Sequence, residues 1–265
     1  MVKQYRKPLR FKKRKLIYGQ RFFWPTLLVL IISGGFFYLL FSSPIFQIKK
    51  IEITGNQKIS TGEIQNLIQT QIKKRMLFFD TKSIFLARLN KIDEVILKEF
   101  PQIAETNSKR RFPDTLKIGI KERKPLAIFS DSENYFLIDR QGIIFEQVGS
   151  DYQGLKIKNL ILIESPKLGQ RAVEKEKLKQ IFEIESKLKD ELKILISEAS
   201  IVSEKRLNIK TLEGWQIYFN PTKDIKNQLF NLILTLREKI PPEGWKNLEY
   251  IDLRFEGRVY YKFLN

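Results

Sequence analysis

The stretch FPDTLKIGIKERKPLA, residues 112–127, carries a clear strand signal near the middle of the chain. Apolar Leu116, Ile118 and Ile120 alternate with polar or small residues, which is the period of a strand with one buried face. This strand ends a segment that begins at residue 46, and a differently patterned segment follows it. The elements on its two sides therefore decide the fold.

Upstream of this strand, residues 46–99 predict one strand and two helices. The strand covers residues 46–53, and its apolar phase shifts once, as a bulge or a twist would produce. One helix starts near Ser60, and a second helical pattern covers residues 81–99 and is stopped by Pro101. The order β-α-α-β-β predicts two helices packed on one face of a small sheet.

A fully apolar segment precedes this module. Residues 22–41 contain no charged residue, and at about 1.5 Å each they span about 30 Å, the thickness of a membrane's hydrocarbon core. Residues 1–21 hold nine Lys or Arg and no Asp or Glu, which predicts that this flank stays in the cytoplasm. We expect a single-pass anchor, with a cleaved signal peptide at Ser33-Gly34-Gly35 as the alternative.

The composition narrows the function classes. Lys and Arg exceed Asp and Glu by 18, but half of this excess lies in the basic tail, residues 1–21. The charge of the rest of the chain is therefore weaker evidence for nucleic-acid binding. The chain has no Cys and no His, which removes disulfides, thiolate metal sites and the commonest general base. We therefore expect no catalytic residue, no metal and no cofactor, and neither a nucleic acid nor a small-molecule substrate as a partner.

The segment after residue 126 changes to short strands and two longer helices. Helical spacing of apolar residues covers residues 172–192 and 222–239, and Pro241-Pro242 ends the second run. Strand-like runs fill the rest, at residues 127–129, 135–138, 143–145, 155–163, 194–203, 205–211 and 215–219. This pattern predicts a curved antiparallel sheet with both helices against one face.

The chain closes on a predicted hairpin, NLEYIDLRFEGRVYYKF, residues 247–263. Its first strand runs to Phe255, Glu256-Gly257 supplies the turn, and Val259, Tyr261 and Phe263 alternate with polar neighbours. The last strand has one neighbour guaranteed by the hairpin. Its other edge is either a plain edge protected by charge or a site where a partner's strand adds itself.

A basic cluster, Lys109-Arg110-Arg111, is predicted on an external loop. Such a cluster attracts anionic cell-wall polymer or lipid headgroups. A solvated loop without a ligand is the alternative.

Several motifs resemble the FtsQ/DivIB family of bacterial cell-division proteins. The aromatic-Pro-x-Thr-Leu turn and Glu-Arg-x-Pro strand end of that family's polypeptide-transport-associated (POTRA) domain match Phe112, Pro113, Thr115, Leu116, Glu122, Arg123 and Pro125. YIDLRFEGRVYYK, residues 250–262, is similar to the family's closing signature of Ile/Val-Asp-Leu-Arg-aromatic, a turn and a final strand. The family order of basic tail, anchor, POTRA domain and β-domain covers the full chain.

The resemblance implies a non-enzymatic scaffold of the divisome that helps control septal cell-wall synthesis. Such a protein is single-pass in the cytoplasmic membrane, enriched at the division septum, with its bulk outside the cytoplasm. Glu122-Arg123 would form a structural corner between the two domains. The implied boundaries are a tail at residues 1–21, an anchor at 22–41, a POTRA domain at 45–123 and a β-domain at 124–265.

The resemblance also implies the partners. These are FtsB- or DivIC-like and FtsL-like division proteins, other divisome membrane proteins and the lipid bilayer. The C-terminal strand, with the helix before it, would receive the extracytoplasmic parts of the FtsB- and FtsL-like proteins. The residues carried over to this role are Phe255, Arg258, Val259, Tyr260, Tyr261, Lys262 and Phe263.

Two other functions stay open at this point. A POTRA-containing transport or chaperone component would be expected to show repeated POTRA units or a membrane barrel, and the sequence shows one unit. A membrane-anchored hydrolase would need a nucleophile and a base, for which Ser203 and Lys205 are the candidates. Their spacing matches no nucleophile motif and is typical of a turn between strands.

Overall fold

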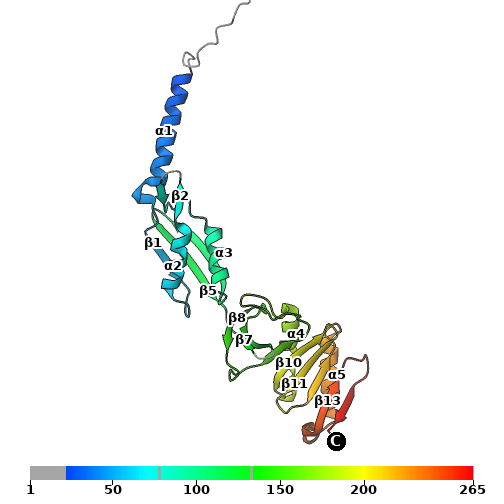
Figure 1. The fold of residues 1–265 in the computed structure, drawn as a ribbon. Helices are drawn as coiled ribbons and strands as arrows, with labels where there is room; N and C mark the ends of the chain where they lie inside the picture. Colours follow the sequence, from blue (N-terminus) through cyan, green and yellow to red (C-terminus); the bar gives the residue numbers. More distant parts are fainter. Residues whose placement is uncertain (1–21, 77–78, 132–133, 265) are drawn as a thin grey trace, which may run out of the picture.

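The structure is a computed structural model that describes residues 22–76, 79–131 and 134–264. Figure 1 shows an elongated molecule in which a long helix, a small first module and a larger second module follow one another. The α+β fold class predicted from the sequence is confirmed. The predicted basic tail, residues 1–21, lies outside the described residues.

Helix α1, Phe23–Ser42, is the predicted apolar segment. Its 20 residues correspond to about 30 Å at 1.5 Å per residue. The helix extends away from the two modules except at its C-terminal end, which meets the first module (Figure 1). Most of its side chains are exposed. By its length and composition α1 fits a membrane anchor.

The first module is a three-stranded sheet with two helices on one face (Figure 1). The strand order is β1-β5-β4, with β1 parallel and β4 antiparallel to the central β5. A short hairpin, β2 with β3, is added to the predicted β-α-α-β-β order. The bounds are β1 Lys50–Thr54, α2 Thr61–Ile72, β2 Lys74–Met76, β3 Phe79–Thr81, α3 Leu89–Glu99, β4 Ile103–Arg111 and β5 Thr115–Glu122.

Two predicted elements of this module are shorter in the structure. The strand expected from residue 46 begins at Lys50, because a 3-10 turn, η2 (Pro44–Phe46), precedes it. Helix α3 begins at Leu89 rather than at residue 81, because the preceding segment crosses the core as irregular backbone. Ile84 in that segment is fully buried, which explains why its apolar spacing continued the helical pattern.

The cluster Lys109-Arg110-Arg111 lies at the end of β4 and not on a loop, so that prediction is wrong. The side chain of Arg110, its middle residue, forms hydrogen bonds within the fold. The guanidinium of Arg110 donates to the carbonyl oxygens of Ile84 and Ala87 at 2.7 Å each. These bonds supply donors to carbonyl oxygens of the irregular backbone before α3. The alternating sequence pattern does not reveal this role of Arg110.

Glu122 joins the end of β5 to the loop after β1 in the first module. Its carboxylate accepts from the backbone N–H groups of Gln57, Lys58 and Ile59 at 2.7–3.2 Å. Burial raises the pKa of Glu122, but these backbone hydrogen bonds outweigh it and hold the pKa below its usual value of 4.5. The loop after β1 is thereby fixed to the end of β5.

Arg123 joins the first module to the second. Its Nε donates to the Pro101 carbonyl at 2.9 Å, and its Nη1 lies 2.5 Å from the Asp139 carboxylate. The side chains of this ion pair are only 11% and 9% exposed. Asp139 also accepts from the N–H groups of Gln141 and Ile143 in its own turn. Glu122-Arg123 therefore forms the corner between the modules that the family resemblance implied.

The second module is a nine-stranded sheet in the order β14-β13-β12-β11-β10-β9-β6-β7-β8. Its β8 end lies near the first module, and its β14 end lies far from α1 (Figure 1). The bounds are β6 Ala127–Asp131, β7 Asn134–Ile138, β8 Ile144–Val148, β9 Lys156–Asn159, α4 Lys175–Leu192, β10 Ile196–Ser203, β11 Arg206–Thr211, β12 Gln216–Phe219, α5 Ile225–Glu238, η3 Pro242–Asn247, β13 Leu248–Asp252 and β14 Tyr260–Phe263.

The sheet is antiparallel at most of its pairings, but not at all of them as expected. β9 pairs in parallel with both β6 and β10, and β12 pairs in parallel with β13. Helix α4 connects β9 to β10, and α5 connects β12 to β13. A helical crossover returns the chain to the same end of the sheet, so the next strand runs in the same direction.

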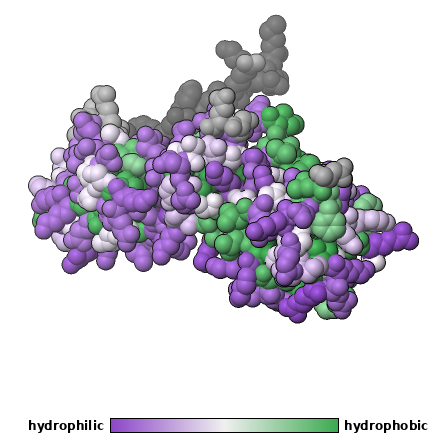
Figure 2. Space-filling model, turned by 90° about the horizontal axis from the view of Figure 1, so that it is seen from below, coloured by the Kyte–Doolittle hydropathy of each residue, from purple (hydrophilic) through white to green (hydrophobic). Residues whose placement is uncertain are grey.

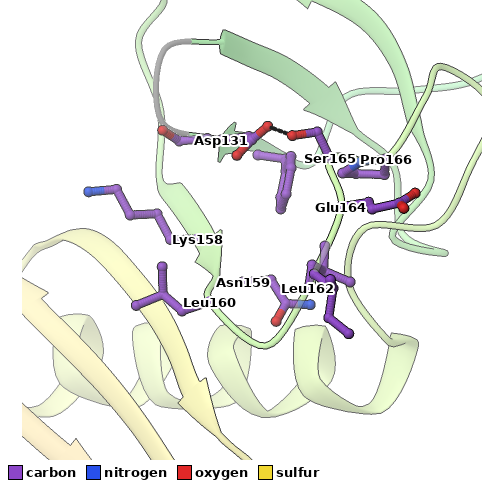
Figure 3. Close-up of a pocket in the computed structure, with 11 residues that line it drawn as sticks. Asp131, Lys158, Asn159, Leu160, Leu162, Glu164, Ser165 and Pro166 are labelled. Carbon is purple, nitrogen blue, oxygen red and sulfur yellow. Dashed lines mark hydrogen bonds between the residues drawn. The ribbon is translucent and has the colours of Figure 1, made fainter.

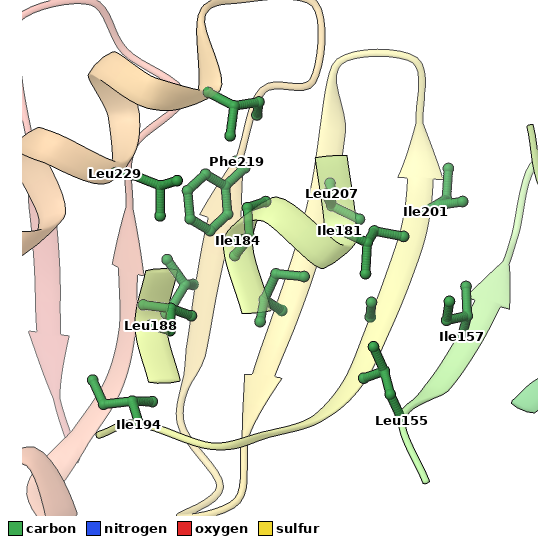
Figure 4. Packing of buried hydrophobic residues seen from close by; sticks show 14 of the residues in the cluster. Leu155, Ile157, Ile181, Ile184, Leu188, Ile194, Ile201, Leu207, Phe219 and Leu229 are labelled. Carbon is green, nitrogen blue, oxygen red and sulfur yellow. The ribbon is translucent and has the colours of Figure 1, made fainter. Parts of the chain in front are cut away.

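Both helices pack their apolar stripes on one core, as Figure 4 shows for part of it. Leu178, Ile181, Ile184 and Leu188 of α4 are buried there, and so are Ile225, Leu229, Leu232 and Leu236 of α5. These are positions that the helical spacing predicted. The predicted strand over residues 155–163 is shorter, because β9 ends at Asn159 and Leu160 to Ile163 are exposed.

Candidate partner-binding edge

Strand β14 is the terminal strand of the nine-stranded sheet, and among the described residues it pairs with β13 alone. The register places Ile251 opposite Tyr261, and Asp252 opposite Tyr260. The chain therefore presents one strand edge at the end of the molecule that is farthest from α1 (Figure 1). For this edge the sequence left two alternatives, a plain edge protected by charge or a site where a partner's strand adds itself.

The backbone amides of β14 divide between its two edges. Just beyond the strand, the N–H of Leu264 donates to the carbonyl of Asn247 at 2.7 Å, toward β13. Amides alternate in direction along a strand, so those of Tyr260 and Lys262 share this inward direction. The N–H groups of Tyr261 and Phe263 consequently face the free edge, where an added strand would accept them.

The side chains of β14 are more exposed than the alternating pattern predicted. All four of its residues, Tyr260 to Phe263, are exposed, although one face was expected to be half-buried. Val259, just before the strand, does pack against the core. A side chain on the outermost strand has a neighbouring strand on one side only, which limits its burial. Tyr261 and Phe263 contact each other edge-to-face at 5.8 Å.

The turn before β14 is longer than the expected Glu256-Gly257 pair. β13 ends at Asp252, so Phe255 and Arg258 lie in the loop and not in strands. Gly257 has φ 66°, a conformation that favours glycine. Phe255 still reaches the edge, because its ring lies edge-to-face with Tyr260 at a centroid distance of 5.3 Å. The structure thus brings Phe255 together with Tyr260, and the backbone N–H of Arg258 donates to the Phe255 carbonyl at 3.3 Å.

A ladder of aromatic rings and guanidinium groups continues from this edge across the open face of the sheet. Tyr218 of β12 stacks on Tyr250 of β13 at 5.3 Å. Arg206 and Arg254 lie over the Tyr218 ring at 4.8 and 5.6 Å, at distances typical of cation–π contacts. The sequence pattern does not reveal this ladder. Its only local signal is a Tyr on each of two strands, and their pairing is set by the α5 crossover.

Arg254 is held in place by Asp252. The guanidinium donates two hydrogen bonds to the carboxylate, at 2.9 and 2.6 Å. Burial raises the pKa of Asp252, but the hydrogen bonds and charge of Arg254 outweigh it and lower the pKa from its usual 3.8. The pair fixes the loop that carries Phe255 to the end of β13.

This pair predicts an acid-sensitive contribution to stability. Because the folded-state pKa of Asp252 is lowered, its contribution is present above pH 3.8 and is lost as the pH falls through the folded-state value. We expect Asp252→Asn to lower the free energy of unfolding near pH 7 and to have a smaller effect near pH 3, as measured by urea unfolding. An equal effect at both pH values would contradict this assignment.

Helix α5 adds a second apolar surface beside the same end of the sheet. Its inward stripe is buried, but Phe230 is 63% exposed and Leu234 is 42% exposed on the outward side. These residues are four apart and lie on one face of the helix. Figure 2 views the molecule from this distal end, where green apolar patches interrupt a mostly hydrophilic surface.

Two other regions of the second module are candidate sites. The pocket in Figure 3 lies between β6 and the loop after β9, and Asp131 and Ser165 form a hydrogen bond on its wall. Ser203 and Lys205, the hydrolase candidates, are exposed in the turn between β10 and β11. The Ser203 hydroxyl accepts from the backbone N–H of Lys205 at 3.3 Å, which is a turn contact.

Two family models match the chain in the order of its modules. Residues 46–123 match the POTRA domain of FtsQ type, and residues 127–254 match the C-terminal domain of cell division protein FtsQ/DivIB. The second match includes β13 and Arg254 and ends before β14.

Curated relatives extend the likeness to most of the chain. A cell division protein DivIB of Clostridium acetobutylicum is 27% identical over 226 residues, which are 82% of this chain and 83% of the relative. A DivIB of Clostridium tetani is 24% identical over 83% of this chain and 80% of its own length. A cell division protein FtsQ of Novosphingobium aromaticivorans is 28% identical over 68% of this chain and 49% of its own length. With both modules matched in order, the chain belongs to the FtsQ/DivIB family of cell-division proteins.

Proposed function

We propose that this protein is a non-enzymatic, membrane-anchored scaffold of the divisome that binds FtsB- or DivIC-like and FtsL-like partners at its β14 edge. The observation that carries the proposal is the free edge of β14, with the Tyr261 and Phe263 amides directed outward. An extended partner segment would add a strand there, and its backbone would supply most of the affinity.

Side chains around the edge would select the partner. Phe255, Tyr260 and the Tyr218–Tyr250 ladder present rings on the open face of the sheet. Phe230 and Leu234 present an apolar stripe on α5, which suits an amphipathic partner helix. A partner with a helix followed by a strand could use both surfaces. The proposed binding residues remain Phe255, Arg258, Val259, Tyr260, Tyr261, Lys262 and Phe263.

The rest of the chain would position this edge. We propose a basic cytoplasmic tail at residues 1–21, an anchor at 22–41, a POTRA domain at 45–123 and a β-domain at 124–265. The modules would lie outside the cytoplasm, at the division septum. Partner binding there would bias septal cell-wall synthesis through linkage, because a ligand shifts an equilibrium by its difference in affinity between two states.

Truncation tests the proposal. We expect a chain that ends at Gly257 to lose capture of the extracytoplasmic FtsB- and FtsL-like segments of the same organism, because it lacks β14. The intact chain should capture them. The matched control is Leu212→Asp, which changes an exposed apolar residue outside β14 and should leave binding unchanged. Capture and cell division that survive the truncation would refute the proposal.

A further inference from the structure

The first module, the POTRA domain, is fixed directly to the end of α1. The carbonyl of Phe41, in the last turn of α1, accepts from Gln47 Nε2 at 2.9 Å and from Thr81 Oγ1 at 2.8 Å. Gln47 Oε1 in turn accepts from the backbone N–H of Lys82 at 2.7 Å. The segment around residues 81–82 is thus held against the helix end, and the domain cannot turn freely about a flexible linker.

Large apolar side chains are exposed at this same end of the domain. Ile45 is 60% exposed, Phe85 is 37% exposed and Phe112 is 57% exposed. The rings of Phe46, Phe85 and Phe112 form a continuous row, with centroids 5.3 Å apart at each step. They come from three separate segments, so the row is a feature of the fold. A contiguous exposed apolar surface of this kind indicates a binding partner.

Strand register and backbone contacts bring several lysines to this end of the domain. The N–H groups of Lys49 and Lys50 both donate to the carbonyl of Asp114, next to the turn that carries Phe112. Two further lysines, Lys109 and Lys117, lie directly opposite each other on β4 and β5. Like charges in this position repel each other, although Glu52, which lies opposite Lys117 on β1, offsets part of the repulsion.

The carboxylates of Glu52, Asp80 and Asp114 offset part of this positive charge, and Asp114 is in no ion pair among the described residues. Glu52 is already paired with Arg111 at 3.2 Å, and Asp80 with Lys73 at 3.2 Å. Within the part of the chain that the structure describes, no ion pair involves the remaining lysines at this end, which are Lys49, Lys50, Lys82, Lys109 and Lys117. The end of the domain therefore combines an apolar row with an excess of lysines over carboxylates.

We propose that this end of the POTRA domain docks on anionic lipid headgroups of the membrane that α1 crosses. The inference rests on the membrane anchoring in the proposed function. Ile45 follows the end of α1 at Ser42 by three residues, so a spanning α1 leaves this surface at the headgroup level. Aromatic rings favour that level, and lysines there gain from anionic lipids. Docking would set the direction in which the elongated molecule leaves the membrane.

A site-specific fluorescent label tests the docking. The chain has no Cys, so a single introduced Cys on the full chain accepts one label. Labels at Phe112→Cys, Leu39→Cys in α1 and Leu212→Cys in the β-domain are compared in vesicles of phosphatidylglycerol and phosphatidylcholine. The quencher is a nitroxide on the upper acyl chain, below the headgroups. We expect strong quenching at positions 39 and 112, and several-fold weaker quenching at 212.

Lysine substitutions test the contribution of charge. In the Phe112→Cys background, Lys50→Gln with Lys109→Gln should lower the docked-to-undocked ratio by about fivefold per lysine on anionic vesicles. The same pair should have little effect on vesicles of phosphatidylcholine alone. The matched control is Lys239→Gln with Lys246→Gln, which removes two exposed lysines at the distal end and should leave the ratio unchanged.

The outcomes separate this inference from the proposed function. Quenching at 39, with no more quenching at 112 than at 212, overturns the docking and leaves the anchor intact. Absence of quenching at 39 overturns the anchor and the docking together. A docked-to-undocked ratio that changes with neither the lysine substitutions nor the lipid charge overturns the anionic-headgroup assignment.

Discussion

Replacement of Arg123 by methionine is expected to lower the free energy of unfolding by about 3–5 kcal/mol. Its partner Asp139 is almost fully buried, and the variant would leave that carboxylate without its counter-charge. Methionine would also leave the Pro101 carbonyl without the hydrogen bond from Arg123 Nε. Removing one member of a buried pair costs more than the pair itself contributes, because the remaining charge stays desolvated.

Urea unfolding of the full chain in detergent measures this effect. Asp139→Asn added to Arg123→Met should recover part of the loss, since the amide oxygen still accepts from Gln141 and Ile143. The control is Lys58→Met, which removes a second ion pair between the modules, Lys58–Glu146 at 3.2 Å. Lys58 is exposed there, so its loss should cost less than about 1 kcal/mol. Equal costs for the Arg123 and Lys58 variants would show that the corner is not held by its buried pair.

Tyr261→Pro is expected to weaken partner binding by about 2–3 kcal/mol, roughly 30–150-fold in Kd. Proline removes the N–H that faces the free edge, so a carbonyl of the added strand would be left without its donor. The hairpin itself should survive, because proline is tolerated on an edge strand where its missing N–H faces outward. Tyr260→Pro is a different change, since the Tyr260 amide points toward β13 and its loss would disrupt the hairpin.

Elements with a strong and local period could be predicted from the sequence. The apolar stripes of α4 and α5 and the alternation in β5 are buried at the positions that their spacing indicated. One buried face dictates such a pattern, so the pattern reveals the face. The C-terminal hairpin was predicted from the same kind of period, but its turn is longer than expected and all four residues of β14 are exposed.

Features that depend on distant pairings could not be predicted in this way. The parallel pairing of β12 with β13 brings Tyr218 onto Tyr250, and no local period records that pairing. Ile84 fitted the apolar spacing of a helix, but it is apolar because irregular backbone buries it in the core. The longer turn before β14 depends on how Arg254 folds back on Asp252. In each case a tertiary contact overrides the local signal.

The most direct test compares Tyr261→Pro with Tyr261→Ala in the full chain, reconstituted in nanodiscs. The binding partner is an FtsB-like extracytoplasmic segment of the same organism, and Kd is measured for both variants. Both substitutions remove the ring, but only proline removes the edge-facing N–H. We predict that the proline variant binds at least tenfold more weakly than the alanine variant, with unchanged thermal unfolding. Equal affinities for the two folded variants would show that the partner does not add a strand to β14.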